Sequence, residues 1–248
     1  MRLLLINPNT STFVTDTVVA EARRVASEGT EIAGVTGTRG APIIGCRTEN
    51  AIGTYEAIEL AATHSDGFDA ILLAVSFDSG LRPLREHLAI PVVGMSESAM
   101  LTACMLGGKF SLVTFGTRAV TLYEELVESY GLAGRYAGTV TLPPLSEDEL
   151  RNPSTIVPRL VEEIERATAE QGAEAIILAG AVFAGLTDEI KTRVPIPVVD
   201  GIATGVRMAE TLVALDFGKP RTGSYAAPQG KSLQGVSAEL AALYEKLR

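Results

Sequence analysis

The sequence predicts an α/β protein made of two related halves, each with helices packed around a parallel β-sheet. Short aliphatic runs that end in turn residues alternate with segments of helical periodicity, which is the pattern of repeated βα units. The second observation is an internal repeat: AILLAVSFDSGL (70–81) and AIILAGAVFAGL (175–186) are identical at six of twelve positions. The repeat favours two homologous halves over one long sheet.

The first half contains four predicted strands, at residues 3–6, 31–35, 70–75 and 91–94. A polar loop follows the first strand, and Thr10 or Ser11 in it is suited to cap a helix whose apolar positions are 14, 18, 22 and 25. A Gly-rich loop follows the second strand and precedes a helix with apolar positions 51, 55, 58 and 62. Shorter helices are expected at 81–88 and directly after the fourth strand.

The second half repeats this order, with strands predicted at 110–114, 136–142, 175–179 and 196–199. IPVVDGIATG (196–205) matches IPVVGMSESA (90–99) at nearly the same interval as the first repeat. A helix with apolar positions 202, 206, 209 and 213 follows, then a Gly- and Pro-rich connection from Gly218 to Gly230. A last helix carries one apolar stripe, on Val236, Leu240, Leu243 and Leu247.

The two halves lack a low-complexity linker between them, so we expect them to pack tightly and to share a cleft. The predicted division assigns residues 1–96 together with 206–248 to the first half and residues 97–205 to the second. Ligands of parallel α/β sheets bind beyond the carboxyl ends of the strands. Four loops occupy such positions, at 7–10, 76–80, 114–117 and 180–182, and the duplication places Ser76 opposite Ala181.

Composition excludes several classes of partner. The 21 basic and 30 acidic residues give a net charge of −9 with no basic cluster, which argues against nucleic acid. The longest run without a charged or hydroxyl residue, 175–186, is shorter than the roughly 20 residues that span a bilayer. We expect a cytoplasmic protein that does not bind membranes. The two cysteines have no metal-ligand spacing, and Cys104 lies in an apolar stretch typical of a buried, inert thiol.

Six ordered motifs carry a family resemblance: LLLINPNT, VSFDSGL, IPVVGMSESA, FSLVTFGTR, AEAIILAGAVFAGL and IPVVDGIA. Together they resemble the aspartate/glutamate/hydantoin racemase superfamily, nearest its hydantoin and allantoin racemase branch, from residue 2 to about 215. The resemblance implies two four-stranded Rossmann-like halves with the active site in the cleft between them. It also implies chemistry at an acidic carbon next to a carbonyl, without metal or cofactor, in a homo-oligomer.

The resemblance implies two catalytic cysteines, one in each half, that exchange protons with opposite faces of the substrate. This sequence departs from that pattern, because the corresponding positions are Ser76 and Ala181. Alanine carries no exchangeable proton, and serine is a poor base without an activating partner. The usual two-thiol mechanism is therefore excluded. A natural sub-branch, a recruited base, an inactive binding protein and an engineered variant remain open.

Three residues are candidates for a replacement base. Asp78 lies two residues after Ser76 and could activate it, or it could cap the helix at 81–88. Glu97 could reach the cleft, or it could be a first-turn acid stabilised by the helix dipole. Cys46 lies in a loop that borders the substrate in the family. The two histidines, His64 and His87, precede strands and are expected at the surface.

Substrate-binding residues are expected from the four loops. Neutral donors (Asn9, Thr10, Thr114, Thr117) could hold a carboxylate, imide or ureido group beside backbone N–H groups of Gly180, Ala181 and Val182. Phe77, with Val182 and Phe183, would form an apolar wall. These loops contain no evident cationic clamp, which favours a neutral or delocalised ligand such as a hydantoin.

The first functional hypothesis is a cofactor-independent, hydantoin racemase-like enzyme in which Ser76, assisted by Asp78, moves a proton on one face of a small hydantoin, ureide or carboxylate. With Ala181 opposite, a lyase, hydrolase or one-face isomerase is the alternative. An inactive small-molecule-binding homologue is the second hypothesis. A nucleotide-binding domain is disfavoured, because neither GxGxxG nor GxxxxGK[ST] follows any strand.

Overall fold

Two parallel sheets of four strands form the frame of the molecule. The computed structural model describes residues 1–229 and 231–245. The first sheet has the order β2-β1-β3-β4 and the second the order β6-β5-β7-β8, so the same topology occurs twice. All eight predicted strands are confirmed: β1 Arg2–Asn7, β2 Glu31–Thr36, β3 Ala70–Leu73, β4 Val92–Gly94, β5 Phe110–Phe115, β6 Tyr136–Leu142, β7 Ala175–Leu178 and β8 Val198–Val199.

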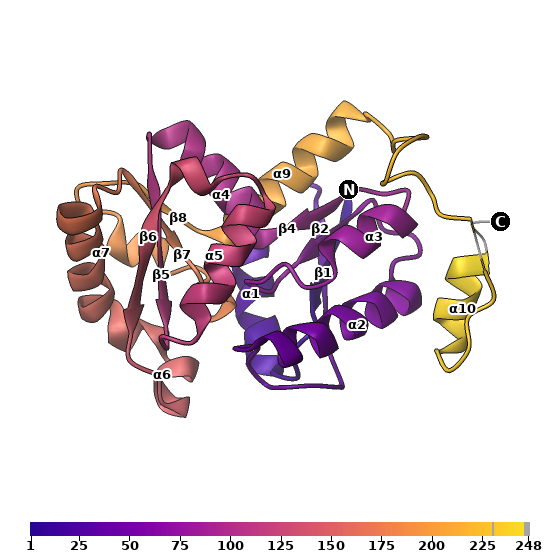
Figure 1. Ribbon diagram of the computed structural model, residues 1–248, viewed down its shortest axis with the longest axis horizontal. Helices are drawn as coiled ribbons and strands as arrows, with labels where there is room; N and C mark the ends of the chain where they lie inside the picture. The colour runs from indigo at the N-terminus through magenta and orange to yellow at the C-terminus, as the bar shows by residue number, and fades with distance from the viewer. Residues whose placement is uncertain (230, 246–248) are drawn as a thin grey trace.

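Helices cover both faces of each sheet (Figure 1). In the first half they are α1 Thr12–Val25, α2 Arg47–His64, α3 Leu81–His87 and α4 Met95–Leu106. In the second half they are α5 Ala119–Ser129, α6 Glu147–Arg151, α7 Val157–Gln171, α8 Thr187–Ile190 and α9 Gly201–Leu215, with 3₁₀ turns η1 Ala133–Arg135, η2 Pro153–Ile156 and η3 Ala181–Phe183. The last helix is α10 Ala238–Glu245.

Strand β1 shows why these short runs fold as buried strands. Its side chains alternate between the two faces of the sheet, and Leu3 and Leu5 enter one core while Leu4 and Ile6 enter the other. All four are fully buried, as expected where helices cover both faces of a parallel sheet. Each core also contains side chains from the second sheet, so the two halves pack against each other without an intervening linker.

Two helices cross from one half to the other. Helix α4 follows β4 but packs against β5, β7 and β8, whereas α9 follows β8 but packs against β3 and β4. The two helices also pack against each other where the sheets meet (Figure 1). Each sheet is therefore covered in part by a helix that starts in the other half. The division of the chain at residues 96 and 206 stays a prediction.

The C-terminal part of the chain returns to the first half. Helix α10 packs against α2 (Figure 1). The Leu240 side chain of α10 is buried. Val236 precedes this helix and does not belong to it. Two residues of the predicted C-terminal elements, Gly230 and Leu247, lie outside the described residues.

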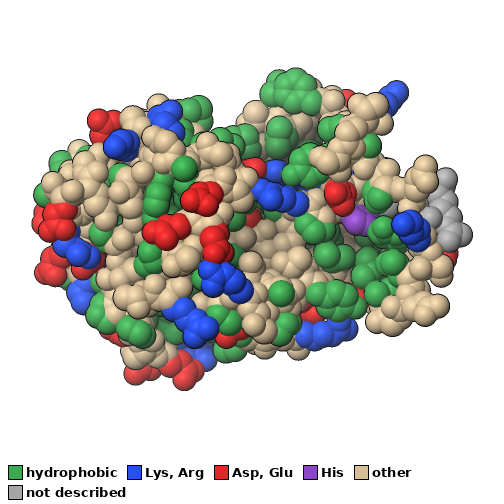
Figure 2. All heavy atoms as spheres, viewed as in Figure 1, with side chains coloured by type: hydrophobic (Ala, Val, Ile, Leu, Met, Phe, Trp, Pro, Cys, Tyr) green, Lys and Arg blue, Asp and Glu red, His purple; other side chains and the backbone are tan. Residues whose placement is uncertain are grey.

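The surface carries mixed charge. Figure 2 shows acidic and basic side chains interspersed over the face in view. Within residues 1–229 and 231–245, no helix has the length and apolar character needed to cross a membrane.

Candidate functional site

A small cavity lies at the carboxyl ends of the central strands, between the two halves. Its volume is about 80 Å³, several times what one water molecule needs. Each of the four strand-end loops contributes at least one lining residue. The loop before α2 and helix α5 cover them. The lining residues are Asn9, Val14, Ile43, Ile44, Gly45, Val75, Ser76, Phe77, Thr114, Phe115, Ala119, Tyr123, Ala179, Gly180, Ala181 and Val182.

The buried side chain of Asn9 presents a donor to this cavity. Its Oδ1 accepts hydrogen bonds from Asn7 Nδ2 and from the backbone N–H of Ser11, each over 2.9 Å. These two bonds go to Oδ1 and so fix the orientation of the Asn9 amide, and Nδ2 takes part in neither of them. Within the described part of the chain, Nδ2 of Asn9 has no hydrogen-bond acceptor among the side chains or the backbone. Its two N–H groups can therefore bind a ligand.

Three hydroxyl groups meet on one side of the cavity. The Tyr123 phenol donates to the carbonyl of Ala179 over 3.1 Å and lies near the hydroxyls of Ser76 and Thr114. Burial raises the pKa of Tyr123 to about 12, and the two neighbouring hydroxyls act in the opposite direction. Tyr123 is therefore a protonated donor at neutral pH. This cluster combines side chains from the two halves.

Aromatic and aliphatic side chains form the remaining wall. The rings of Phe77 and Tyr123 lie 4.7 Å apart between centroids, and those of Phe115 and Phe183 form a T-shaped pair with centroids 5.6 Å apart. Phe77, Phe115 and Val182 line the cavity, whereas Phe183 is buried behind Phe115. A tight apolar wall of this kind favours a small ligand with little charge.

Ser76 and Ala181 both line the cavity, from opposite halves of the molecule. Ala181 begins η3, directly after Gly180 and close to the end of β7. No Asp, Glu, His, Lys, Arg or Cys side chain is among the residues described as lining the cavity. Proton-carrying groups are thus confined to the side where Ser76, Thr114 and Tyr123 meet.

The two other threonines that were expected to bind substrate lie outside the cavity lining. Thr10 is half-buried, and its backbone N–H donates to the carbonyl of Ala41. Thr117 is exposed, because the chain turns outward at Gly116, whose φ of 73° is in the left-handed region. The role of both residues in binding stays a prediction that this geometry does not favour.

Asp78 is completely buried, but it faces helix α4 and does not line the cavity. The backbone N–H of Ser96 donates to Oδ1 over 3.0 Å, and that of Glu97 donates to Oδ2 over 2.8 Å. The Tyr130 hydroxyl also donates to Oδ2, over 2.6 Å. The geometry thus favours a capping role over a direct base, although the capped helix is α4 and not the expected helix at 81–88. Direct catalysis by Asp78 stays a prediction.

The other candidate bases are also engaged elsewhere. Glu97 lies in the first turn of α4 and accepts from Arg85 Nη1 over 3.0 Å, with a second bond to Nη2. Cys46 is the N-cap residue of α2, next to Gly45 at the cavity. Cys104 is half-buried, where full burial was expected.

His64 is exposed as expected, whereas His87 is half-buried and stacks on Tyr244. Across residues 1–229 and 231–245, no three His, Cys, Asp or Glu side chains cluster as metal ligands would.

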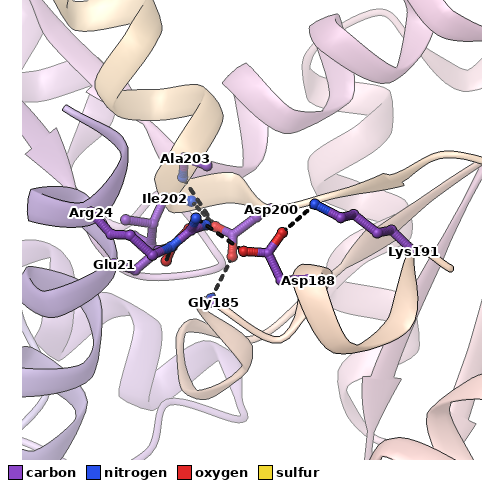
Figure 3. Close-up of polar contacts among 8 residues, drawn as sticks. All are labelled: Glu21, Arg24, Gly185, Asp188, Lys191, Asp200, Ile202 and Ala203. Carbon is purple, nitrogen blue, oxygen red and sulfur yellow. Dashed lines mark hydrogen bonds and ion pairs between the residues drawn. The ribbon is translucent and has the colours of Figure 1, made fainter. Parts of the chain in front are cut away.

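On the second half, Asp200 fixes the loop that follows Ala181 (Figure 3). Its carboxylate accepts from the backbone N–H groups of Ile202 and Ala203 at the start of α9, over 2.7 and 3.0 Å. It also accepts from the backbone N–H of Gly185 over 2.7 Å. Burial raises the pKa of Asp200, and the three donors oppose this shift.

Sequence reasoning missed Tyr123 and the loop residues Ile43, Ile44 and Gly45. The spacing of Tyr123 and Tyr130 was a usable signal, because seven residues place both phenols on one face of a helix. A buried phenol needs a hydrogen-bond partner, and the two find theirs at the cavity and at Asp78. What the sequence did not show is that α5 covers the cleft.

Comparison with known proteins agrees with this architecture. The model of the Asp/Glu/Hydantoin racemase family matches residues 3–209. A hydantoin racemase of a Pseudomonas species is 34% identical over 237 residues, which cover 95% of this chain and 95% of that protein. The crystal structure of the allantoin racemase from Pseudomonas fluorescens superposes with a TM-score of 0.90 at 35% identity, covering 95% of this chain and all of the other.

The allantoin racemase from Klebsiella pneumoniae gives the same TM-score at 33% identity, covering 97% of this chain and 98% of the other. Glutamate racemase RacE1 from Bacillus anthracis, at 16% identity and a TM-score of 0.65, shares the fold. The chain therefore belongs to the Asp/Glu/hydantoin racemase family, and its relatives support a racemase- or isomerase-type enzyme.

Proposed function

We propose that this member of the Asp/Glu/hydantoin racemase family moves a proton at the acidic carbon of a small hydantoin or ureide, without the usual pair of cysteine thiols and without a cofactor. The observation that carries the proposal is the cavity itself. It joins strand ends of both halves and offers hydrogen-bond donors without a charged side chain among its described lining residues.

Substrate binding is assigned to the neutral donors. A cyclic imide or ureide carries two or more carbonyl groups and no localised charge, so amide and hydroxyl donors suit it better than a cationic clamp. Asn9 and Thr114 line the cavity, and we assign the binding of carbonyl oxygens of such a ring to Asn9 Nδ2 and the Thr114 hydroxyl. The aromatic wall around Phe77 is the apolar part of the lining that the substituent of the ring would contact.

Removing the proton places negative charge on the neighbouring carbonyl oxygen. The Tyr123 phenol is protonated at neutral pH, and we assign to it the hydrogen bond to that oxygen, in a buried site where such a bond is stronger than in water. The Ser76 hydroxyl relays the proton: its oxygen takes the proton from carbon while its own hydroxyl proton passes to water in the cavity, and the reverse transfer returns a proton to the same face. A serine hydroxyl is a weaker base than a thiolate, so the reaction should be slow compared with that of a two-thiol racemase.

The proposed chemistry uses one face of the substrate. Ala181 stands where the second thiol is expected, and a methyl group cannot return a proton to the opposite face. Proton return then comes from the Ser76 side or from water in the cavity. The expected results are exchange with retained configuration, or slow racemisation through water. The cytoplasmic location and the homo-oligomer expected from the sequence stay predictions.

The test is proton exchange in D₂O, followed by NMR and polarimetry. Allantoin and 5-substituted hydantoins are compared with aspartate, glutamate and arylmalonates, with protein-free samples and the Ser76→Ala variant correcting for spontaneous exchange. Exchange above both controls for a hydantoin or ureide supports the proposal. Turnover of the amino acids or arylmalonates alone would reassign the substrate, and no exchange with any compound contradicts catalysis.

A binding protein without catalysis is the second candidate, because no strong base lies among the described residues that line the cavity. It predicts that hydantoins raise the melting temperature, since a ligand that binds only the folded state stabilises it. It also predicts no proton exchange. Stabilisation together with exchange rejects this second candidate.

A further inference from the structure

The carboxylate of Asp78 joins three structural elements near the cavity. It belongs to the loop between β3 and α3, and it binds the first turn of α4 through the backbone N–H groups of Ser96 and Glu97. Its third donor is the hydroxyl of Tyr130, at the C-terminal end of α5. Helices α4 and α5 both pack against the second sheet, so these contacts join the first half to the second.

The joined elements carry or contact the residues that line the cavity. Asp78 lies two residues after Ser76 in the same loop, and the Ser76 carbonyl accepts from the Ser96 hydroxyl over 2.6 Å. Tyr130 lies two turns after Tyr123 on the same face of α5. A shift of Asp78 relative to α5 would therefore change the distance between the hydroxyls of Ser76 and Tyr123.

We infer that Asp78 is a positioning residue, which holds Ser76 and Tyr123 in register by binding the first turn of α4 and Tyr130 at once. The inference rests on the proposed function, because that function gives Ser76 and Tyr123 their roles. Asp78 touches no substrate in this arrangement, since it lies outside the lining of the cavity.

Two features of the backbone near Asp78 accommodate its carboxylate. Gly94 immediately precedes α4, and a β-carbon there would lie 2.4 Å from Cγ of Asp78. The φ of Asp78 itself is 48°, an uncommon value that asparagine and aspartate adopt more readily than other residues. Both features favour a fixed position for Asp78. The titratable and charged groups around the carboxylate are Glu97 on α4, Tyr123 and Tyr130 on α5, and Arg85 on α3.

Asparagine at position 78 cannot accept all the hydrogen bonds that the Asp78 carboxylate accepts. Oδ2 accepts from both the Glu97 N–H and Tyr130, whereas Oδ1 accepts from Ser96. An asparagine has one acceptor oxygen, so one backbone N–H of α4 would face an amide N–H. Tyr130→Phe is the milder change, because it removes only the link to α5.

The experiment compares Asp78→Asn and Tyr130→Phe with two matched controls. Asp200→Asn removes an acceptor from the corresponding helix start in the second half, and Tyr136→Phe removes a phenol whose one hydrogen bond among the described residues is with Thr139 on its own strand. Proton exchange into allantoin gives kcat and KM. Amide hydrogen exchange of residues 76–80 and of α5 gives a readout that does not depend on activity.

We expect Tyr130→Phe to lower kcat about tenfold with KM within twofold of wild type, since small displacements of reacting groups reduce rate more than binding. Amide exchange should quicken in residues 76–80 and α5 for both test variants and in neither control. Unchanged amide exchange, or unchanged kcat despite faster amide exchange, would overturn the positioning role. If the wild type exchanges no substrate proton, the proposed function fails, and unchanged amide exchange alone would still refute the link.

Discussion

The carboxylate of Asp78 fills the space that a side chain at position 94 would need. A β-carbon on Gly94 would lie 2.4 to 2.7 Å from the three carboxylate atoms of Asp78, well inside van der Waals contact. In the second half the carboxylate comes from the other of these two positions. Asp200 stands at the position that corresponds to Gly94 and caps α9 with its own carboxylate, while Phe183 stands at the position that corresponds to Asp78. In each half, therefore, a carboxylate accepts hydrogen bonds from the first backbone N–H groups of the corresponding helix. The carboxylate comes from a different position in the two halves.

This relationship predicts that an aspartate at position 94 can cap α4 in the first half, as Asp200 caps α9 in the second. Gly94 has φ −90° and ψ 136°, close to the −96° and 124° of Asp200, so an aspartate fits the backbone there. We expect Asp78→Ala and Gly94→Asp each to destabilise the protein, the first by loss of a cap worth about 0.5 to 2 kcal/mol and the second by overlap with the Asp78 carboxylate.

The double variant Asp78→Ala with Gly94→Asp should be more stable than either single variant, because the new carboxylate replaces the lost one. Urea unfolding of the four proteins measures the coupling between the two sites. A double variant no more stable than Asp78→Ala alone would show that an aspartate at position 94 does not cap α4, because relief of the overlap with Asp78 can by itself restore only the stability of Asp78→Ala. Because the double variant lacks the Tyr130 link, it should regain stability without regaining kcat.

The predicted strands were confirmed because buried parallel strands are short aliphatic runs whose assignment needs only local sequence. Contacts between distant segments were harder to predict. Asp78 was a candidate base or activator of Ser76, with capping of the helix three residues later as the alternative, whereas its hydrogen-bond donors lie 18, 19 and 52 residues away. Tyr123 was missed for the same reason, since its place in the cavity depends on how α5 crosses the cleft. Thr117 was expected there from its position after a strand, but the turn at Gly116 exposes it.

The proposed roles of Ser76 and Ala181 predict a gain of function. Introducing cysteine at both positions places a thiol on each side of the cavity, and thiols titrate closer to neutrality than serine. Ser76→Cys with Ala181→Cys should accelerate proton exchange into allantoin at least tenfold and convert retained configuration into racemisation. Ser76→Cys alone should accelerate exchange with retained configuration.

Polarimetry and NMR on the same samples separate these outcomes. Cys104 lies outside the cavity lining, so Cys104→Ala in the double-cysteine background is a control that should leave the gain unchanged. Equal rates for wild type and the double-cysteine variant, with folding intact, would contradict the placement of the two positions across the substrate.

The buried Asp78 predicts how stability depends on pH. Burial raises its pKa from 3.8 to about 7, and the three hydrogen-bond donors reduce the shift. Between these two pH values the folded state holds a proton that the unfolded state has released. The contribution of Asp78 to stability is therefore fully present below pH 4 and is lost as the pH rises towards 7.

The check is the free energy of unfolding of wild type minus that of Asp78→Asn, measured in urea from pH 4 to pH 8. Asparagine does not titrate, so the difference isolates this carboxyl group, and we expect it to decline across the interval. Tyr136→Phe should give a difference that is independent of pH. A difference that increases with pH would mean that the three donors outweigh burial and that Asp78 is ionised throughout.

The last prediction concerns the ion pair between Arg47 and Glu125, which joins the two halves beside the cavity. Arg47 begins α2, two residues after the cavity residue Gly45, and Glu125 lies two residues after Tyr123 on α5. Both side chains are more than half exposed, at 63% and 52%, so the pair should contribute less than about 1 kcal/mol to stability. A weak contact at this place can break when a ligand enters or leaves.

We expect Arg47→Gln and Glu125→Gln to leave the urea midpoint nearly unchanged while increasing both the association and the dissociation rate of allantoin, measured from NMR line shapes. In the wild type, added salt should increase the same rates, because an exposed ion pair is screened. Glu147→Gln, which breaks an exposed pair with Arg151 on α6, is the matched control and should alter neither rate. If neither salt nor the two test substitutions changed the association and dissociation rates of allantoin, access to the cavity would not pass between α2 and α5.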